Sequence, residues 1–160
     1  MVDLNEIYTT KVLELAANMP LGGRLGAPDA TASAYSKLCG SRIIVDLKVK
    51  GDVVSEYAQD VRACLLGQAS AAIMGANIVG STTAELREVG AQMRSMLKEN
   101  GPPPQGRWSD LMLLESVRTY KARHASTLLV FDAVEAALAQ IESSQFFKSV
   151  PSPSLVEREA

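Results

Sequence analysis

The stretch Arg42-Ile43-Ile44-Val45-Asp46-Leu47-Lys48-Val49-Lys50 predicts the centre of a β-sheet. Apolar side chains alternate along it with side chains that are mostly polar, which is the period of a strand with one buried face. Gly51-Asp52 supplies a turn, after which residues 53–61 can return antiparallel to the first strand. A further strand is expected over residues 32–38. Together these segments predict a small three-stranded antiparallel sheet.

Helical patterns lie on both sides of the predicted strands. Thr82 is a good N-cap residue, and Glu85 further along predicts a capping box at the start of one helix. Asn100-Gly101 and the prolines that follow end that helix. This order indicates an α+β domain with helices packed on one face of the sheet and a helical C-terminal half. Helices are expected over residues 3–18, 65–79, 82–99 and 127–142, with a short helix and connector over 108–120.

The length and composition fit one globular domain. The chain has 160 residues and a mass of 17.1 kDa, and 47% of its residues are hydrophobic. We expect this domain to span residues 1–142. Residues 143–160 turn to Ser, Pro and charged side chains, which predicts a flexible C-terminal tail.

The composition also argues against several classes of protein. A formal net charge of −2 argues against nucleic-acid binding, which needs a strongly basic surface. The N-terminus lacks the pattern of a secretory signal, and the charge-free run over residues 63–84 is too polar for a membrane span. A cytoplasmic location is therefore expected. The sequence shows neither a convincing nucleophile–base–acid set nor a glycine-rich phosphate loop, so we do not expect an enzyme.

Two cysteines carry most of the chemical information in the chain. Cys39 lies in the turn before the central strand, and Cys64 follows the returning strand. Thiolates are the soft ligands that iron, zinc and persulfide sulfur require. Two thiols alone cannot close a structural zinc site or most iron–sulfur clusters, which take four ligands. The alternative interpretation is two buried thiols that act as small hydrophobic side chains.

Motifs spread over most of the chain resemble a known family. Leu38-Cys39-Gly40 is similar to a Cys-Gly-Asp turn, and residues 63–71 are similar to a cysteine loop that leads into a helix of small residues. In order and spacing, residues 5–140 resemble the iron–sulfur cluster assembly scaffolds of the IscU, SufU and NifU N-terminal type. The long connection before the last helix is similar to an insertion of the SufU subtype. Further matching residues are Ile7-Tyr8, Leu111, Leu114, Val117-Arg118, Tyr120, Ala122, Arg123 and Asp132-Ala133.

The same resemblance shows where ligands have been lost. The family's acidic ligand position falls on Ser41, and its third cysteine falls on Ser126. The histidine that precedes this cysteine in IscU members falls on Ala125, beside the single histidine of the chain, His124. Hydroxyl groups are poor ligands for iron or zinc beside thiolate.

The resemblance implies a scaffold, or a carrier of sulfur or iron, in iron–sulfur cluster assembly. Cys39 and Cys64 would hold a labile iron–sulfur cluster or iron, with His124 as a further candidate metal ligand and zinc as an alternative cation. The implied partners are a cysteine desulfurase and recipient apoproteins, and two thiols would suit a site shared in a homodimer or larger complex. The alternative is a degenerate scaffold, kept as a structural or interaction subunit without metal or other cofactor.

The resemblance also predicts how the site is arranged. Cys39 and Cys64 should lie close enough to share one site at one end of the sheet. His124 and Ser126 should lie near that pair, because the third ligand segment of the family falls at the start of the last helix. Ser126 itself is expected to be the N-cap of that helix. Since the chain offers fewer than the four ligands of a zinc site, the isolated protein should bind metal weakly.

Overall fold

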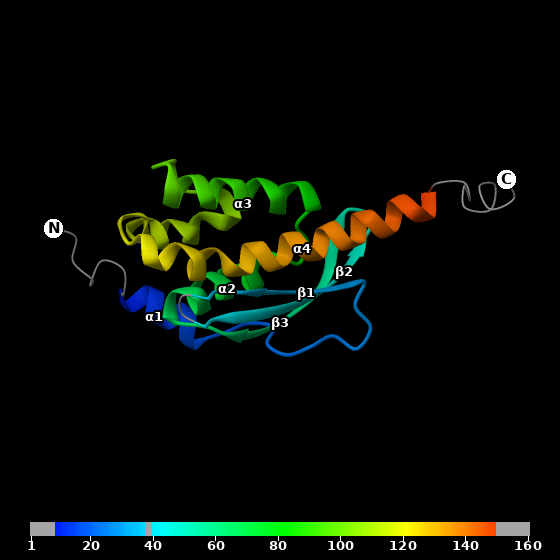
Figure 1. The fold of residues 1–160 in the computed structure, drawn as a ribbon, viewed down its shortest axis with the longest axis horizontal. Helices are drawn as coiled ribbons and strands as arrows, with labels where there is room; N and C mark the ends of the chain where they lie inside the picture. Colours follow the sequence, from blue (N-terminus) through cyan, green and yellow to red (C-terminus); the bar gives the residue numbers. More distant parts are fainter. Residues whose placement is uncertain (1–8, 38–39, 150–160) are drawn as a thin grey trace, which may run out of the picture.

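The computed structural model describes residues 9–37 and 40–149. Along these residues a short helix is followed by three strands and then by helices (Figure 1). The α+β class predicted from the sequence is confirmed. The elements are α1 (Thr10–Ala17), β1 (Ala30–Tyr35), β2 (Arg42–Lys50), β3 (Val53–Arg62), α2 (Leu65–Asn77), α3 (Thr83–Lys98), the 3-10 helices η2 (Gly106–Thr119) and η3 (Lys121–Arg123), and α4 (His124–Ser149).

The three strands form one antiparallel sheet with β2 in the centre. The central strand has the predicted bounds, whereas β1 covers residues 30–35 instead of 32–38. Ile43, Val45 and Leu47 on β2 are fully buried, as the alternating pattern requires for the face that lies beneath helices.

Helices cover that face in two layers. α2 and α4 lie next to the strands, and α4 crosses β1 and β2 (Figure 1). α3 and η2 pack against these helices on the side away from the sheet. The predicted packing of helices on one face is thus confirmed, and α2 lies in the middle of the molecule with contacts to α1, α4, η2 and β3.

The connection between α3 and α4, predicted as a short helix and connector, is the 3-10 helix η2. Its buried side chains recur every third residue, at Trp108, Leu111, Leu114 and Val117. A 3-10 helix has about three residues per turn, so this spacing places all of them along one buried face. The spacing is visible in the sequence and favours a 3-10 helix over an α-helix, whose period is about 3.6 residues.

The starts of two other helices follow their cap residues. Thr9 accepts a hydrogen bond from Val12 N at 3.2 Å, so α1 begins at the next residue, and the part of the predicted helix over residues 3–8 lies outside the described residues. Thr82 caps α3 as predicted, because its hydroxyl accepts the N–H of Glu85 at 3.0 Å. The Glu85 carboxylate has another role than the predicted capping box, since its Oε2 accepts a hydrogen bond from Trp108 Nε1 at 2.8 Å.

The last helix starts earlier and ends later than predicted. α4 covers His124–Ser149 instead of residues 127–142. The sequence has neither glycine nor proline in this range, so no residue breaks the backbone hydrogen bonding. Residues 143–149 are therefore helical, and residues 150–160 lie outside the described part of the chain, so the flexible tail stays a prediction.

The loop between α1 and β1 covers part of the opposite face of the sheet. Asp46 of β2 is fully buried on this face. Its carboxylate accepts hydrogen bonds from Arg24 Nε at 2.6 Å, from Leu25 N at 3.0 Å and from Thr31 Oγ1 at 2.6 Å. Burial alone would raise the pKa of Asp46, but these hydrogen bonds and the Arg24 charge hold the pKa below its ordinary value. The ionised carboxylate therefore fastens the loop to the sheet.

We expect Asp46→Asn to lower the free energy of unfolding by about 1–3 kcal/mol, the usual effect of leaving a buried donor without its partner. The pKa of Asp46 is lower in the folded protein than in the unfolded chain. Its contribution to the free energy of unfolding is therefore fully present above the unfolded pKa of about 3.9, and it is lost as the pH falls through the folded pKa. Urea unfolding at neutral pH and below about pH 3 measures both effects, and the difference from wild type should shrink in acid. The exposed Asp110→Asn serves as the control. Equal losses in the two variants would contradict the role of Asp46.

Candidate functional site

Cys64 lies where β3 passes into α2. It is the N-cap residue of α2, with an extended backbone (φ −66°, ψ 172°), and its side chain is partly exposed. Arg62 at the end of β3 pairs with Arg42 at the start of β2, so Cys64 lies at the end of the sheet where the β1–β2 connection returns. The thiol is therefore accessible from solvent at that end.

The β1–β2 connection ends beside Cys64. The N–H of Ser36 donates to Ser41 O, and that of Gly40 donates to Ser36 O, both at 2.8 Å, so the connection is closed at its base. Gly40 has a φ of 71°, which glycine adopts without strain. The N–H of Cys64 donates to Ser41 Oγ at 3.4 Å. Ser41, on which the family's acidic ligand position falls, thus lies next to Cys64.

Cys39 belongs to this connection but lies outside the described residues. The close approach of Cys39 and Cys64 therefore stays a prediction. The described residues on both sides of Cys39 define the frame of the connection, which begins at Ser36 and reaches Cys64 through Ser41.

The start of α4 is the third segment at Cys64. The thiol donates to Ser126 Oγ at 3.4 Å, and the Ser126 hydroxyl donates in turn to Arg123 O at 3.2 Å. The structure thus brings Ser126 to Cys64, as expected from the resemblance. The N-cap prediction for Ser126 is wrong, because α4 begins at His124 and places Ser126 within the first helical turn. There its hydroxyl bonds to a preceding carbonyl, as serine commonly does inside helices.

His124 is buried in the same turn and holds η2 in place. Its Nε2 lies 3.2 Å from Val117 O and 3.0 Å from Arg118 O. Carbonyl oxygens only accept hydrogen bonds, so Nε2 must carry the proton and any lone pair for a metal must be on Nδ1. The imidazole is only 7% exposed, and its observed contacts are those of a structural histidine. Its role as a metal ligand stays a prediction.

A glycine allows the close approach of α2 and α4 at this site. A Cβ on Gly67 would lie 2.8 Å from Ala63 Cβ and 3.2 Å from Ser126 O. One turn further along α2, Ser70 Oγ donates to Thr127 O at 2.7 Å. The sequence signal for this contact was a glycine within a predicted helix, which we did not identify as part of the site.

The described part of the site therefore offers one thiol between two hydroxyl groups. Ser41 and Ser126 can form hydrogen bonds to sulfur, but they cannot supply the negative charge of a carboxylate or a second thiolate. Within residues 9–37 and 40–149, no group of three or more His, Cys, Asp or Glu side chains could hold a metal ion. Binding of iron or a cluster by Cys64 would thus need further ligands from beyond the described residues, of which Cys39 is the predicted one.

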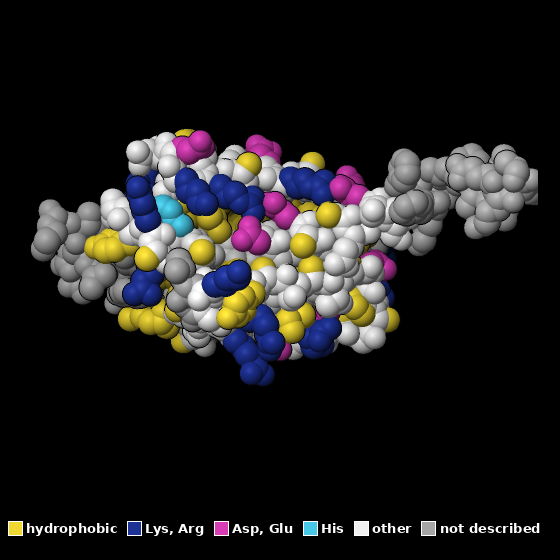
Figure 2. Space-filling view, in the orientation of Figure 1, with side chains coloured by type: hydrophobic (Ala, Val, Ile, Leu, Met, Phe, Trp, Pro, Cys, Tyr) yellow, Lys and Arg dark blue, Asp and Glu magenta, His cyan; other side chains and the backbone are white. Residues whose placement is uncertain are grey.

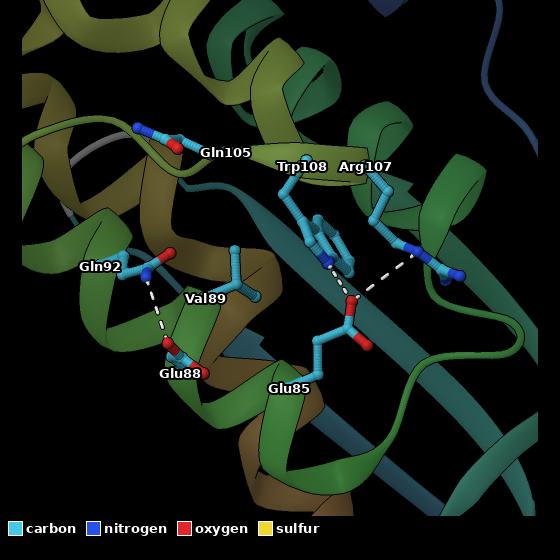
Figure 3. A pocket seen from close by; sticks show the side chains of 8 residues that line it. Glu85, Glu88, Val89, Gln92, Gln105, Arg107 and Trp108 are labelled. Atoms are coloured by element: carbon cyan, nitrogen blue, oxygen red, sulfur yellow. Dashed lines mark hydrogen bonds and ion pairs between the residues drawn. The ribbon is translucent and has the colours of Figure 1, made fainter.

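A hollow of about 270 Å³ lies elsewhere, between α3 and η2 (Figure 3). Glu85 projects into it and is held by Trp108 Nε1 at 2.8 Å and Arg107 Nε at 3.7 Å. The start of α3 adjoins the β2–β3 turn, at the end of the sheet opposite to Cys64. This hollow is therefore not part of the cysteine site. Glu85, which lines the hollow, has a structural role in fixing η2.

The fold and site define the class of protein: an α+β domain that presents a cysteine, at the end of its sheet, where three segments of the chain meet. Among the described helices, none is long and apolar enough to cross a bilayer.

Comparisons with known proteins point to one family, although no protein-family model matches the chain. The structure matches a crystal structure of the N-terminal part of a nitrogen-fixing NifU-like protein from Brucella abortus with a TM-score of 0.86 and 51% identity, over 88% of this chain and 97% of that one. The iron–sulfur cluster assembly scaffold protein IscU of Thermotoga maritima is 25% identical over 136 residues, which are 84% of this chain and 94% of IscU.

A third likeness shows the fold alone. The crystal structure of a protein described as an iron–sulfur cluster assembly scaffold for the SUF system, from Fervidobacterium islandicum, matches with a TM-score of 0.78 and 19% identity, over 85% of this chain and 99% of that one.

The chain belongs to the family of iron–sulfur cluster assembly scaffolds that includes IscU and the N-terminal part of NifU-like proteins. The family consists of scaffolds and not of catalytic enzymes, so the prediction that this chain is not an enzyme is confirmed.

We expect Gly67→Ala to destabilise the domain, although alanine favours an α-helix over glycine by about 1 kcal/mol. The new methyl group would meet Ala63 and the backbone of Ser126, and relief of that contact requires α2 and α4 to separate. Thermal unfolding should show a lower Tm. Maleimide labelling followed by mass mapping should show faster modification of Cys64.

Gly90→Ala in α3 is the control for this change, because its methyl group would meet the flexible carboxylate of Glu135. This variant should keep a Tm close to that of wild type. A Gly67→Ala protein as stable as wild type would show that α2 and α4 are not in close contact at this point.

Proposed function

We propose that this protein is a scaffold or carrier in iron–sulfur cluster assembly and that Cys39 and Cys64 hold its cargo of iron, sulfur or a nascent cluster. The observation that carries the proposal is the meeting of three segments at the Cys64 thiol. The β1–β2 connection reaches it through Ser41, and the start of α4 reaches it through Ser126. These are the segments on which the resemblance places the ligands of the family.

The thiols supply the chemistry of this role. As thiolates they can bind iron, or attack the outer sulfur of a persulfide on a donor protein. In that transfer the donor S–S bond breaks, the donor leaves as a thiolate, and Cys64 becomes the persulfide, without net oxidation or reduction. Cargo held by two thiolates and neutral neighbours is labile, which suits a protein that must release what it binds.

We infer that the remaining ligands come from outside the chain, from a second copy or from a partner protein. The donor would be a cysteine desulfurase and the acceptors would be apoproteins, in a cytoplasmic setting. Within the family, the 51% identity supports the NifU-like type. The SufU-like subtype is supported by the long connection that contains η2.

A degenerate scaffold that serves as a structural subunit is the second candidate. The observation that favours it is the presence of hydroxyl groups at Ser41 and Ser126, together with the engagement of His124 Nε2 by backbone carbonyls. Such a protein would keep the fold and bind no cargo.

Cargo loading separates the two candidates. Wild-type protein incubated without oxygen with Fe²⁺, cysteine and catalytic amounts of a desulfurase should retain iron and acid-labile sulfide after desalting. Cys39→Ser and Cys64→Ser should each lower both contents at least about tenfold, because loss of a residue that merely supports a metal ligand already lowers affinity about 10–100-fold. Ser109→Ala, an exposed change on η2, is the control. Folded wild-type protein without iron or sulfide would establish the structural subunit instead.

Restoring the lost ligands should strengthen metal binding. Ser41→Asp with Ser126→Cys adds a carboxylate and a thiol beside Cys64, and zinc affinity should rise at least about tenfold, equivalent to about 1.4 kcal/mol. Competition with a chromogenic chelator under reducing conditions measures the change. Ser109→Cys adds a thiol elsewhere and should have little effect. Undetectable binding by a folded double variant would show that the pocket has been remodelled.

A further inference from the structure

Three exposed side chains form a row across the sheet at the end nearest Cys64. The register pairs Tyr35 of β1 with Arg42 of β2, and Arg42 with Arg62 of β3. Directly opposed residues of antiparallel strands point to the same face, and the next residue on β2, Ile43, is buried beneath the helices. The row therefore points away from the helices. All three side chains are exposed, Tyr35 by 61%. We call Tyr35, Arg42 and Arg62 the sheet-end row.

The fold gains no evident stability from the two arginines of this row. Like charges directly opposite each other on neighbouring strands are destabilising. Neither Arg42 nor Arg62 forms an ion pair with any residue that the structure describes. Asp60, the nearest carboxylate on this face of β3, lies opposite Ile44, and its charge acts on Arg24. A partner outside the described chain would relieve the repulsion.

The row also concentrates positive charge on a protein that is negative overall. Lys37, in the β1–β2 connection, is exposed beside the row, while the formal net charge of the chain is −2. Figure 2 shows Lys and Arg side chains along the side of the molecule that carries the sheet and also over the helices on the other side. A local positive surface of this kind attracts and orients an acidic partner.

We infer that the sheet-end row is the docking surface for an acidic segment of a protein partner in cluster assembly, an inference that rests on the proposed function. Two guanidinium groups side by side can each bind a carboxylate through paired hydrogen bonds. Tyrosine and arginine are also the residue types most enriched among binding hot spots. Arg62 is separated from Cys64 by Ala63 alone, so a partner that docks on the row lies at the end of the sheet from which Cys64 follows.

The extent of the row favours a protein segment over a small anion. Neighbouring strands lie about 4.8 Å apart, so the row spans about 10 Å across the sheet. A phosphate or sulfate ion could bridge the two arginines but would leave Tyr35 uncovered. A peptide segment with carboxylates and an apolar side chain would cover all three residues.

The test compares binding of two probe proteins, the cysteine desulfurase of the same organism and an apo-ferredoxin, to the full chain. The double variant Arg42→Glu/Arg62→Glu should weaken the Kd for at least one probe about tenfold or more, and should flatten the salt dependence of that Kd. Lys50→Glu/Lys98→Glu makes the same change in net charge at exposed sites away from the row and should leave both Kd values close to wild type. Unchanged binding of both probes to the row variant, or no binding of either probe to wild type, would overturn the inference.

A single variant separates docking from stability. Arg62→Gln removes the like-charge contact, so its Tm should be equal to or above that of wild type while probe binding weakens. A structural role for the row predicts the reverse, a lower Tm with unchanged binding. This variant also keeps the test decisive if the double variant fails to fold.

The cargo assay keeps this inference distinct from the proposed function. Arg42→Glu/Arg62→Glu loaded chemically with Fe²⁺ and sulfide should retain cargo as wild type does. Cys39→Ser/Cys64→Ser should still bind the probe. Wild-type protein that binds the probe but retains no cargo would contradict only the scaffold role, and unchanged docking by the row variant would contradict only the docking surface.

Discussion

The enclosure of α2 is the constraint on which the candidate site depends. Most residues of this helix are buried, and many of them are small, so the sheet and α4 can both approach its backbone closely. On the α4 side, Gly67 leaves no room for a side chain, and Ser70 donates to the Thr127 carbonyl at 2.7 Å. Dispersion contacts over such a surface are individually small but sum to a large stabilisation. Their consequence is local: Cys64, at the start of α2, lies beside Ser126 because the two helices cannot move apart without opening the core.

A buried polar network holds the other side of α2 to the sheet. Burial raises the pKa of Tyr57, so its hydroxyl stays protonated and donates to Gln59 Oε1 at 2.8 Å. The Gln59 amide donates in turn to Ala71 O at 2.9 Å, which satisfies a polar side chain that is almost fully buried. Gly75 meets the same amide closely, since a Cβ there would lie 2.8 Å from Gln59 Nε2. The helix that begins beside Cys64 is thus held to the sheet on one side and to α4 on the other.

Local patterns in the sequence predicted the fold well, and long-range contacts account for most of what they missed. The alternation over residues 42–50 gave the bounds of β2, because one buried face requires a period of two. The proximity of Ser126 to Cys64 followed from the resemblance, but its hydrogen bond to Arg123 O depends on where α4 begins. The engagement of His124 depends on carbonyls of η2, whose 3-10 geometry we did not predict. Strand register, which no single segment encodes, was needed to see the sheet-end row.

The loss of ligands and the position of the sheet-end row are physically connected. Hydroxyl groups at Ser41 and Ser126 keep hydrogen bonds around Cys64 while removing the negative charge that would neutralise bound iron. Under the proposed function, the isolated chain should therefore hold its cargo weakly, and a ligand from outside would strengthen the binding. A partner docked on the row raises the effective concentration of such a ligand beside the thiol, without any new contact to the metal from this chain. Because binding free energies are reciprocal, cargo that is held by both proteins must strengthen docking by the same factor by which docking strengthens cargo binding. Departure of the partner would then weaken cargo binding by that factor, so the proposed docking surface would allow a site with few ligands of its own to be loaded and emptied.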